Sequence, residues 1–471
     1  MKHNKFAEQK EISVLIDTFK SNFEQGTVAF HEEAVFIAMI DQCVVTGFFN
    51  EAITISENAL KQHPFSIDIL VRISKISLKL SLFDKTDVTI ERLSALSPQS
   101  IYVVLLRSEL MATQNKPDEA RAFLQAAKTS QAFTDEERAE VFLLEALIFD
   151  SENRYNEMFR TLKTCLLLNA NNKSAYRWIF WAIEHTGKYN AGIAFHNKLI
   201  SQNAYNAEAW LNLGYAHTAL GEHDDALEAF GFTFAIDENC LDAYFESGDI
   251  LLQHKKYKEA QSLFERALIH CGENALVYQK LGICYMHAQS LKQANEYFIK
   301  SLELDAMDAE THFYIGKCAI AANQGSLAVR ALERALDLND TFEEYHAALG
   351  EAYIKTESFF DAIKCFRRAT TIAPERLDLW LQHVGFLISI GQIRTALKII
   401  EEAELNTGSD ELTLYRIGCL FTIGRQREAM ILLSKHLDKN MDKKDLFFQN
   451  FPKLEKEPAL LAVFEAHEIQ R

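Results

Sequence analysis

The chain has 471 residues, of which 48% are hydrophobic, with only 6 Pro and 18 Gly. This apolar content excludes intrinsic disorder, and the scarcity of Pro and Gly favours helices over a turn-rich β fold. The net charge of −17 argues against a nucleic-acid scaffold, because phosphate binding requires a basic surface.

No stretch approaches 18 consecutive apolar residues, so no membrane-spanning helix is expected. The first ten residues are polar, and the short apolar stretch that follows contains Asp17, unlike the core of a signal peptide. The eight cysteines are scattered and form no CxxC pair, which is typical of reduced core thiols. These features together predict a cytoplasmic protein.

The first predicted element is a capping helix over residues 5–24, within an N-terminal cap of residues 1–32. Its apolar side chains recur at helical spacing and leave the opposite side polar. They are Ile12, Leu15, Ile16, Phe19 and Phe23. A helix of this kind can cover the apolar end of an array of helices.

The clearest pattern in the chain is a repeat of 34 residues. Glycines recur at this spacing, and an alanine follows each glycine position by twelve residues. A large side chain comes four residues after that alanine, and an aromatic residue or histidine stands four residues before the glycine. The columns are Gly214, Gly248, Gly282, Gly316, Gly350; Ala226, Ala260, Ala294, Ala328, Ala362, Ala396; Phe230, Phe264, Phe298, Leu332, Phe366, Ile400; and Trp210, Tyr244, Tyr278, His312, His346. Their agreement at one period indicates an array of similar structural units.

Extending this frame in both directions predicts about twelve repeats over residues 33–440. They begin near residues 33, 67, 101, 139, 173, 207, 241, 275, 309, 343, 377 and 411. Four extra residues near 133–138 shift the frame, and the last repeat has a turn one residue short. Pro64, Pro98 and Pro374 fall between repeats, and Pro117 opens a helix, where a missing N–H costs little. Residues 441–471 are predicted to form C-terminal capping helices.

The repeat resembles the tetratricopeptide repeat (TPR) family, whose 34-residue unit is a helix–turn–helix. The residues that carry the resemblance best are Trp210, Leu213, Gly214, Tyr215, Ala226 and Phe230. The resemblance implies an all-α fold, a right-handed α-solenoid superhelix of about twelve repeats with capping helices and one continuous core. We number the 34 positions of each repeat as slots, so that the glycine stands at slot 8 and the alanine at slot 20. The small Gly and Ala residues at these slots let helices A and B approach closely. Large residues at slots 4 and 24 are expected to fill the space between neighbouring repeats.

The repeat at 173–206 departs from this pattern, because Phe180 and Gly192 occupy the slots that are elsewhere Gly and Ala. The larger residue on helix A is compensated by the smallest residue on helix B, which keeps the total side-chain volume between the helices roughly constant. This exchange predicts that the repeat folds like the others.

Motifs that carry chemistry are missing from the sequence. It contains no P-loop, GxGxxG, HExxH or GxSxG motif, and no histidine pair at ligand spacing with a supporting carboxylate. We therefore expect no catalytic, cofactor-binding or metal-binding residues and no enzymatic activity. His312 and His346 stand in the aromatic column, which indicates a packing role.

The resemblance implies that the A helices line a concave groove, with slots 2, 5, 6, 9, 12 and 13 facing a ligand. The candidate partner-binding residues on these slots are Arg177, Trp178, Trp181, Asn212, Tyr215, Phe245, Glu246, Asp249, Lys280, Phe313, Tyr314 and Lys317. Exposed rings with interleaved charge are typical of binding hot spots. The alternative is that the rings only pack against adjacent A helices. The lysine–asparagine pattern by which some TPR domains hold a terminal carboxylate is missing here.

These observations predict a non-catalytic protein–protein interaction scaffold that holds a partner segment or helix in its concave groove. A peptide-sensing regulatory protein and a structural subunit of a larger assembly are the alternatives. No nucleic-acid or membrane partner is expected, and the lack of low-complexity tails favours a bacterial origin. A homodimer through the terminal caps is a further prediction, because the C-terminal cap is rich in apolar residues. These are Leu446, Phe447, Phe448 and Phe451.

Overall fold

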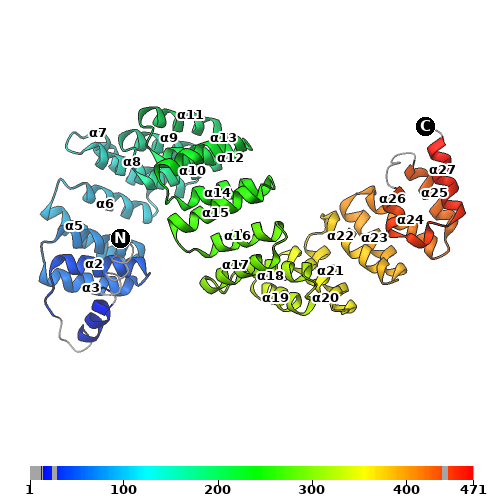
Figure 1. The fold of residues 1–471 in the computed structure, drawn as a ribbon. Helices are drawn as coiled ribbons and strands as arrows, with labels where there is room; N and C mark the ends of the chain where they lie inside the picture. Colours follow the sequence, from blue (N-terminus) through cyan, green and yellow to red (C-terminus); the bar gives the residue numbers. More distant parts are fainter. Residues whose placement is uncertain (1–11, 13, 24–28, 438–443, 470–471) are drawn as a thin grey trace. The chain divides into compact units, whose positions relative to one another are not determined.

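The computed structural model describes residues 12, 14–23, 29–437 and 444–469, and helices dominate this part of the chain (Figure 1). The chain divides into two compact parts, an N-terminal half of residues 1–238 and a C-terminal half of residues 239–471. Within each half, helices pack in antiparallel pairs, and each helix A contacts the helix B that follows it.

The N-terminal half contains six helix pairs among its described residues, with even-numbered helices as helix A. The helices are α2 (Glu33–Val45), α3 (Phe49–Gln62), α4 (Ile67–Lys79), α5 (Phe83–Leu96), α6 (Ile101–Thr113), α7 (Pro117–Thr129), α8 (Asp135–Ser151), α9 (Tyr155–Leu168), α10 (Lys173–Thr186), α11 (Tyr189–Gln202), α12 (Ala207–Leu220) and α13 (His223–Ile236). The longer α8 takes up the four residues that shift the frame, and a capping box of Thr134 and Glu137 fixes its start.

The C-terminal half continues the same alternation. Its helices are α14 (Leu241–Gln253), α15 (Tyr257–Cys271), α16 (Ala275–His287), α17 (Leu291–Leu304), α18 (Ala309–Ala321), α19 (Gly325–Leu338), α20 (Glu343–Lys355), α21 (Phe359–Ile372), α22 (Leu377–Ser389), α23 (Ile393–Thr407), α24 (Thr413–Thr422), α25 (Gln426–Leu437), α26 (Lys444–Asn450) and α27 (Pro458–Ile469), with 3-10 turns η1 (Asp410–Leu412) and η2 (Pro452–Leu454). The fold class predicted from the repeat, an all-α solenoid of TPR-like helix pairs, is confirmed.

The turn between helices A and B has the same backbone conformation in every repeat described. One residue at slot 15 has a positive φ, which Gly adopts without steric cost and Asn tolerates. These residues are Gly47, Ser81, Asn115, Asn153, Gly187, Gly221, Lys255, Gln289, Asn323, Glu357, Gly391 and Gly424. The interval between them is 34 except at the four-residue insertion and in the last, shortened turn.

The slot-8 glycines make room for a side chain of their own repeat. A methyl group at Gly214 would collide with the ring of Phe230, and one at Gly248 would collide with the ring of Phe264. Both rings are fully buried. The large residue at slot 24 therefore fills the space between helices A and B within its own repeat. It also reaches the next repeat, as expected, since the ring of Phe366 lies 5.6 Å from that of Phe386 between centroids.

The slot-4 residues tie helix A to the linker before it. The Nε1 atoms of Trp210 and Trp380 donate to the carbonyl oxygens of Ala204 and Pro374, each at 2.9 Å. A ring nitrogen of His346 lies 3.2 Å from the carbonyl oxygen of Asp340. Histidine thus serves in this column as a polar partner of the linker as well as a packing residue, because its ring carries nitrogen like that of Trp.

The repeat at 173–206 forms its two helices but does not reproduce the usual packing. A methyl group at Gly192 would lie 2.6 Å from Cδ1 of Ile183, not against Phe180. The ring of Phe180 instead contacts that of Tyr215 on the next helix A, with 4.8 Å between centroids. Among the described repeats, the backbones of α10 and α11 make the fewest close approaches of any A/B pair. The expected exchange of volumes between Phe180 and Gly192 is therefore wrong.

At the N-terminal end, residues 14–23 are helical and pack on the first repeat. Phe19 is 3% exposed and its ring meets that of Phe36 edge to face, with 6.3 Å between centroids. Ile16 joins the same buried cluster. The predicted capping helix at 5–24 is thus described in part, and its residues 5–11, 13 and 24 lie outside the described residues.

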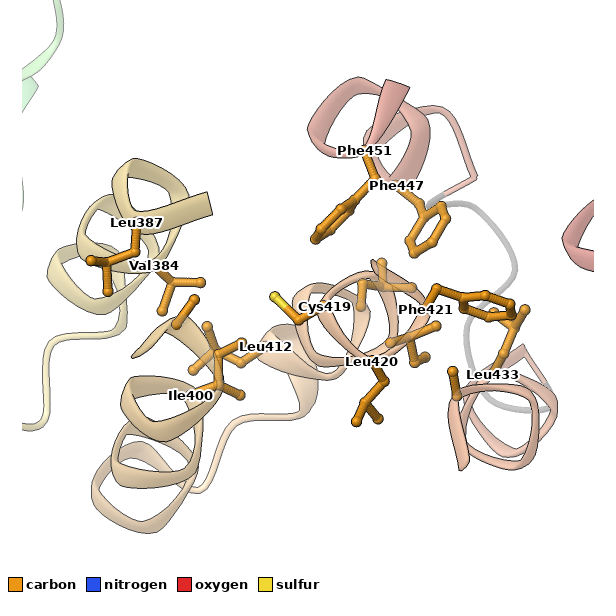
Figure 2. Close-up of a cluster of buried hydrophobic side chains, with 14 of the residues drawn as sticks. Val384, Leu387, Ile400, Leu412, Cys419, Leu420, Phe421, Leu433, Phe447 and Phe451 are labelled. Carbon is orange, nitrogen blue, oxygen red and sulfur yellow. The ribbon is translucent and has the colours of Figure 1, made fainter. Parts of the chain in front are cut away.

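At the C-terminal end, the residue that follows α26 supplies the ring that the last repeat lacks (Figure 2). Gly418 occupies slot 8 of that repeat, and Phe451 lies against it where other repeats use the slot-24 residue of helix B. Phe447 and Phe451 are 1% and 6% exposed in one cluster with Leu420 and Leu433. Both rings are therefore used within the chain, which removes them from the predicted homodimer surface. Leu446 lies outside the described side chains.

The buried apolar residues form several clusters instead of one continuous core, since each cluster is shared by only two or three neighbouring repeats. Within the described residues, none of the helices combines the length and the apolar character needed to cross a membrane.

Candidate partner-binding surfaces on the A helices

In the N-terminal half, the predicted residues of α10 lie in different environments. Arg177 is exposed, Trp178 is partly buried against the core cluster of Tyr176 and Ile183, and Trp181 remains 41% exposed. Trp181 is the best placed of the three to contact a partner.

Local contacts fix the orientation of the Trp181 ring. Its Nε1 donates to Oδ1 of Asp150 at 3.0 Å, and its ring lies 4.0 Å from that of His185 between centroids. His185 in turn contacts Tyr155 at 4.5 Å. A rigid, half-exposed ring loses little side-chain entropy on binding, which favours it as an anchor.

The two predicted residues of α12 do not both reach the surface. Asn212 is only 3% exposed, and its Nδ2 donates to the carbonyl oxygen of Glu208 on its own helix at 2.9 Å. The side chain is therefore packed in the core, and its role as a partner contact stays a prediction. Tyr215 is half-buried between the rings of Phe180 and Phe230.

In the C-terminal half, the predicted acidic and basic residues neutralise one another. Nζ of Lys280 on α16 lies 2.6 Å from Oδ1 of Asp249 on α14, so the pair links consecutive A helices. Phe245 and Glu246 are half-buried on the same helix as Asp249. The charges on these two consecutive A helices therefore compensate each other at this point.

The predicted residues of α18 form a layer of rings with one cation. Phe313 is 7% exposed and stacks on Tyr345 of α20 with 4.8 Å between centroids, while Tyr314 stacks on Phe298 at 5.7 Å. Burial raises the pKa of the Tyr314 hydroxyl, so this group stays protonated at neutral pH. Nζ of the exposed Lys317 lies 5.4 Å from the centroid of the Phe313 ring.

A pocket of about 190 Å³ brings two of these residues together with the next two A helices. Its walls come from α18, α20 and α22, and almost every lining residue stands at slot 2, 5, 6 or 9 of its repeat. The lining residues are Phe313, Lys317, Glu344, Ala347, Ala348, Glu351, Arg376, Asp378, Leu379 and Gln382. The two alanines leave the space open, and the charged groups surround it.

The charges around this pocket are ordered by Arg376, which precedes α22. Its guanidinium donates to Glu343 at 2.9 Å, to Glu344 at 2.8 Å and to Asp378 at 2.6 Å. These hydrogen bonds raise the pKa of Arg376, and the same contact lowers the pKa of Asp378. Both groups therefore stay charged, and the multiply bonded guanidinium holds the pocket wall in one geometry.

Glu351 is the carboxylate of the pocket that lacks a close cationic partner. It joins none of the ion pairs found in the described part of the chain, although Lys317 and Lys355 lower its pKa from a distance. Desolvation outweighs them, and the pKa of Glu351 is raised. Such a carboxylate can accept hydrogen bonds from an amide or a cationic side chain, and the Gln382 amide can both donate and accept.

Sequence reasoning missed the second half of this pocket, although the same slot rule contains it. Glu344, Glu351 and Gln382 stand at slots 2, 9 and 6 of the repeats that begin at 343 and 377. Applying the rule to those two repeats would have named all three residues.

Among the described residues, one group of side chains has ligand atoms close enough together for a metal ion. His217, Glu222 and Asp225 at the turn between α12 and α13 bring ligand atoms within 4.8 Å of one another. Nδ1 of His217 lies 2.6 Å from Oε2 of Glu222, so a hydrogen bond accounts for this approach without an ion.

The comparisons with known proteins agree with this architecture. Family models described as tetratricopeptide repeats match residues 186–231, 241–268 and 343–376. Superkiller protein 3 of Schizosaccharomyces pombe is 22% identical over 64% of this chain and 25% of its own length. The anaphase-promoting complex subunit CDC16 of Saccharomyces cerevisiae is 24% identical over 43% of this chain and 25% of its own length.

Solved structures with related helices include the APC/C hetero-tetramer Cut9–Hcn1, 13% identical, covering 82% of this chain and 95% of its own with a TM-score of 0.42. A tetratricopeptide repeat protein from Parabacteroides merdae is also 13% identical, covering 52% and 97% of the two chains with a TM-score of 0.40. The chain spans about a quarter of the length of the first curated relatives it matches.

The helix pairs, their left-handed turns and the slot-8 packing define a helical-repeat protein with surfaces along its A helices. With the matching family models, these features show that the chain contains several tetratricopeptide repeats. The cytoplasmic location and the bacterial origin stay predictions.

Proposed function

We propose that this chain is a non-catalytic, cytoplasmic interaction scaffold that holds a segment of a partner protein against its A helices. The observation that carries the proposal is the pocket between α18, α20 and α22, whose walls consist almost entirely of the slots expected to face a ligand. An extended peptide could place one side chain over Ala347 and Ala348. Its backbone or a basic side chain could then donate to Glu351 and Gln382.

In the N-terminal half, Trp181 is the residue we propose as a separate contact for the same partner or another. It combines exposure with a fixed ring orientation, whereas Trp178 and Tyr215 are packed against neighbouring apolar side chains. Contacts of this kind, with a few rigid aromatic anchors among neutral neighbours, are typical of protein interfaces.

The test is affinity capture from lysate of the source organism with the intact chain, a Glu351→Lys variant and a Glu303→Lys control. Both glutamates are exposed, but Glu303 lies on α17, a B helix, outside the pocket. We expect a protein captured by the intact chain and the control to be lost with Glu351→Lys. Cross-linking should then connect that protein to α20 or α22. Equal recovery by all three, at matched helicity, would contradict a site in this pocket.

A structural subunit of a larger assembly is the second candidate. Two curated relatives are named for such a role, the anaphase-promoting complex subunit CDC16 and, in Caenorhabditis elegans, the RNA polymerase-associated protein CTR9, 25% identical over 55% of this chain and 22% of its own length. This function predicts co-purification at fixed stoichiometry that survives Glu351→Lys, because an extended interface does not depend on one pocket. A peptide-sensing regulatory protein would instead tighten on binding, which small-angle scattering would detect.

A further inference from the structure

A second hollow lies in the N-terminal half, on the B helices instead of the A helices. Its volume is about 510 Å³, and it opens between α9 and the start of α11. The lining residues are Phe159, Arg160, Lys163, Gly187, Lys188, Asn190 and Ala191. They occupy slots 15 to 25 of their repeats, so the hollow shares no residue with the surfaces discussed above.

The walls of this hollow carry three cations and no carboxylate. Arg160, Lys163 and Lys188 take part in none of the ion pairs between described residues. Nζ of Lys163 lies 4.9 Å from the centroid of the Phe159 ring and 6.0 Å from that of Phe195. Arg154, just before α9, is by contrast paired, since it contacts Glu157 at 2.8 Å.

The repeat that supplies the α11 side of this hollow is basic, unlike the chain as a whole. The repeat at 173–206 has four basic residues and one acidic residue, whereas the whole chain has a net charge of −17. Helix α11 contains no Asp or Glu. The repeat that follows, 207–240, has seven acidic residues and no Lys or Arg. A local excess of positive charge next to negative surface concentrates the field that an anion experiences at the hollow.

We propose that this hollow binds a phosphate group. Arg160, Lys163 and Lys188 line it without a carboxylate among the lining residues. Arg160 can bind a phosphate through two parallel N–H donors, and the Asn190 amide can add another. Gly187 and Ala191 keep the entrance free of bulk, and the volume leaves room for the molecule that carries the phosphate. The carrier is either a phosphorylated side chain of a partner protein or a free phosphorylated small molecule.

The experiment is calorimetric titration of the full chain at low ionic strength with three probes. They are pyrophosphate, a phosphoserine peptide and the same peptide without its phosphate. We expect pyrophosphate or the phosphopeptide to bind, and the unphosphorylated peptide not to bind. Binding of the phosphopeptide alone identifies a partner protein as the source, and binding of pyrophosphate identifies a small molecule.

Charge-reversal variants locate the site. Lys163→Glu and Lys188→Glu should each weaken phosphate binding by about tenfold or more, since each removes a charged contact and adds a repulsive one. Lys198→Glu is the matched control, because Lys198 is exposed on the same helix but does not line the hollow. It should change the affinity by less than about twofold. Circular dichroism checks that all variants keep their helicity.

Two outcomes would overturn the proposal: neither phosphorylated probe binds the intact chain, or Lys198→Glu weakens binding as much as Lys188→Glu. The second outcome would mean diffuse attraction to a basic surface. The site is independent of the pocket on the A helices, so Glu351→Lys should leave phosphate binding unchanged.

Discussion

The repeats from 207 to 376 and the repeat at 173–206 solve the same packing problem with different residues. In the former, a slot-8 glycine lies under a buried ring or leucine, and the two helices approach closely. In the latter, Phe180 occupies that slot, turns toward Tyr215, and leaves α10 and α11 farther apart. The size of one side chain therefore sets the spacing of a helix pair. The divergent repeat also carries Trp181 and part of the basic hollow, so loss of the packing pattern coincides with distinctive surface features.

The largest difference in stability between the two kinds of repeat is expected when the rings of Phe264 and Phe180 are removed. Phe264→Ala should lower the free energy of unfolding by about 4 kcal/mol, because a fully buried ring over Gly248 leaves a cavity. Phe180→Ala should cost about 1 kcal/mol, since this ring is only partly buried and water can occupy its place. Urea denaturation followed by circular dichroism measures both. Equal losses would show that Phe180 is as much a core residue as Phe264.

Adding a methyl group should also affect the stability of the two kinds of repeat differently, and the difference in the free energy of unfolding should be smaller than for removal of the rings. Gly248→Ala forces the rigid Phe264 ring to move and should cost about 2 to 3 kcal/mol. In Gly192→Ala the new methyl meets only Cδ1 of Ile183, which can rotate away, and alanine favours the helix by about 1 kcal/mol. The net change should stay within about 1 kcal/mol. A loss at Gly192 as large as that at Gly248 would mean that the wider helix pair is packed just as tightly.

Acid should destabilise both kinds of repeat through buried histidines. Desolvation lowers the pKa of His196 to about 3, and desolvation with a smaller contribution from Arg367 lowers the pKa of His383 to about 4. Neither ring nitrogen of either side chain has a hydrogen-bond partner among the described residues.

Below pH 6.5 the unfolded chain binds protons that the folded chain does not, so stability falls as the pH falls. Between pH 6.5 and 5 each histidine should cost about 2 kcal/mol. His196→Leu should remove the contribution of His196 to this pH dependence, and His383→Leu should remove the contribution of His383. An unchanged slope in both variants, measured by urea denaturation at each pH, would contradict the buried neutral state.

The positions of the helices could be predicted from the sequence because they depend on local rules. A 34-residue period and one left-handed residue per turn locate the repeats, including the shift before residue 139 and the shortened last turn. The ring over Gly418 could not be predicted, because Phe451 follows α26, outside the repeat. Only the assembled chain brings those two residues together.

The binding surfaces were predictable only in part for a related reason. The slot rule names residues that face one side of helix A, and it led to Phe313 and Lys317. It cannot tell that Asn212 is covered by its neighbours, since burial depends on side chains from other helices. The basic hollow could not be predicted from the sequence, because its residues come from two repeats. The negative net charge of the whole chain also gives no indication of a local excess of positive charge.

The smallest expected loss of stability concerns the charged pair between consecutive A helices. This prediction tests whether the pair contributes to stability or to partner binding. Lys280→Ala breaks the contact with Asp249, yet Asp249 is 44% exposed, so water can solvate its carboxylate and the loss should stay below about 1 kcal/mol. Salt at about 0.5 M should reduce the loss further, because it screens an exposed pair. If urea denaturation shows a larger, salt-independent loss, the pair supports the spacing of α14 and α16. If stability hardly changes but a captured partner is lost, these charges belong to the binding surface, as the slot rule requires.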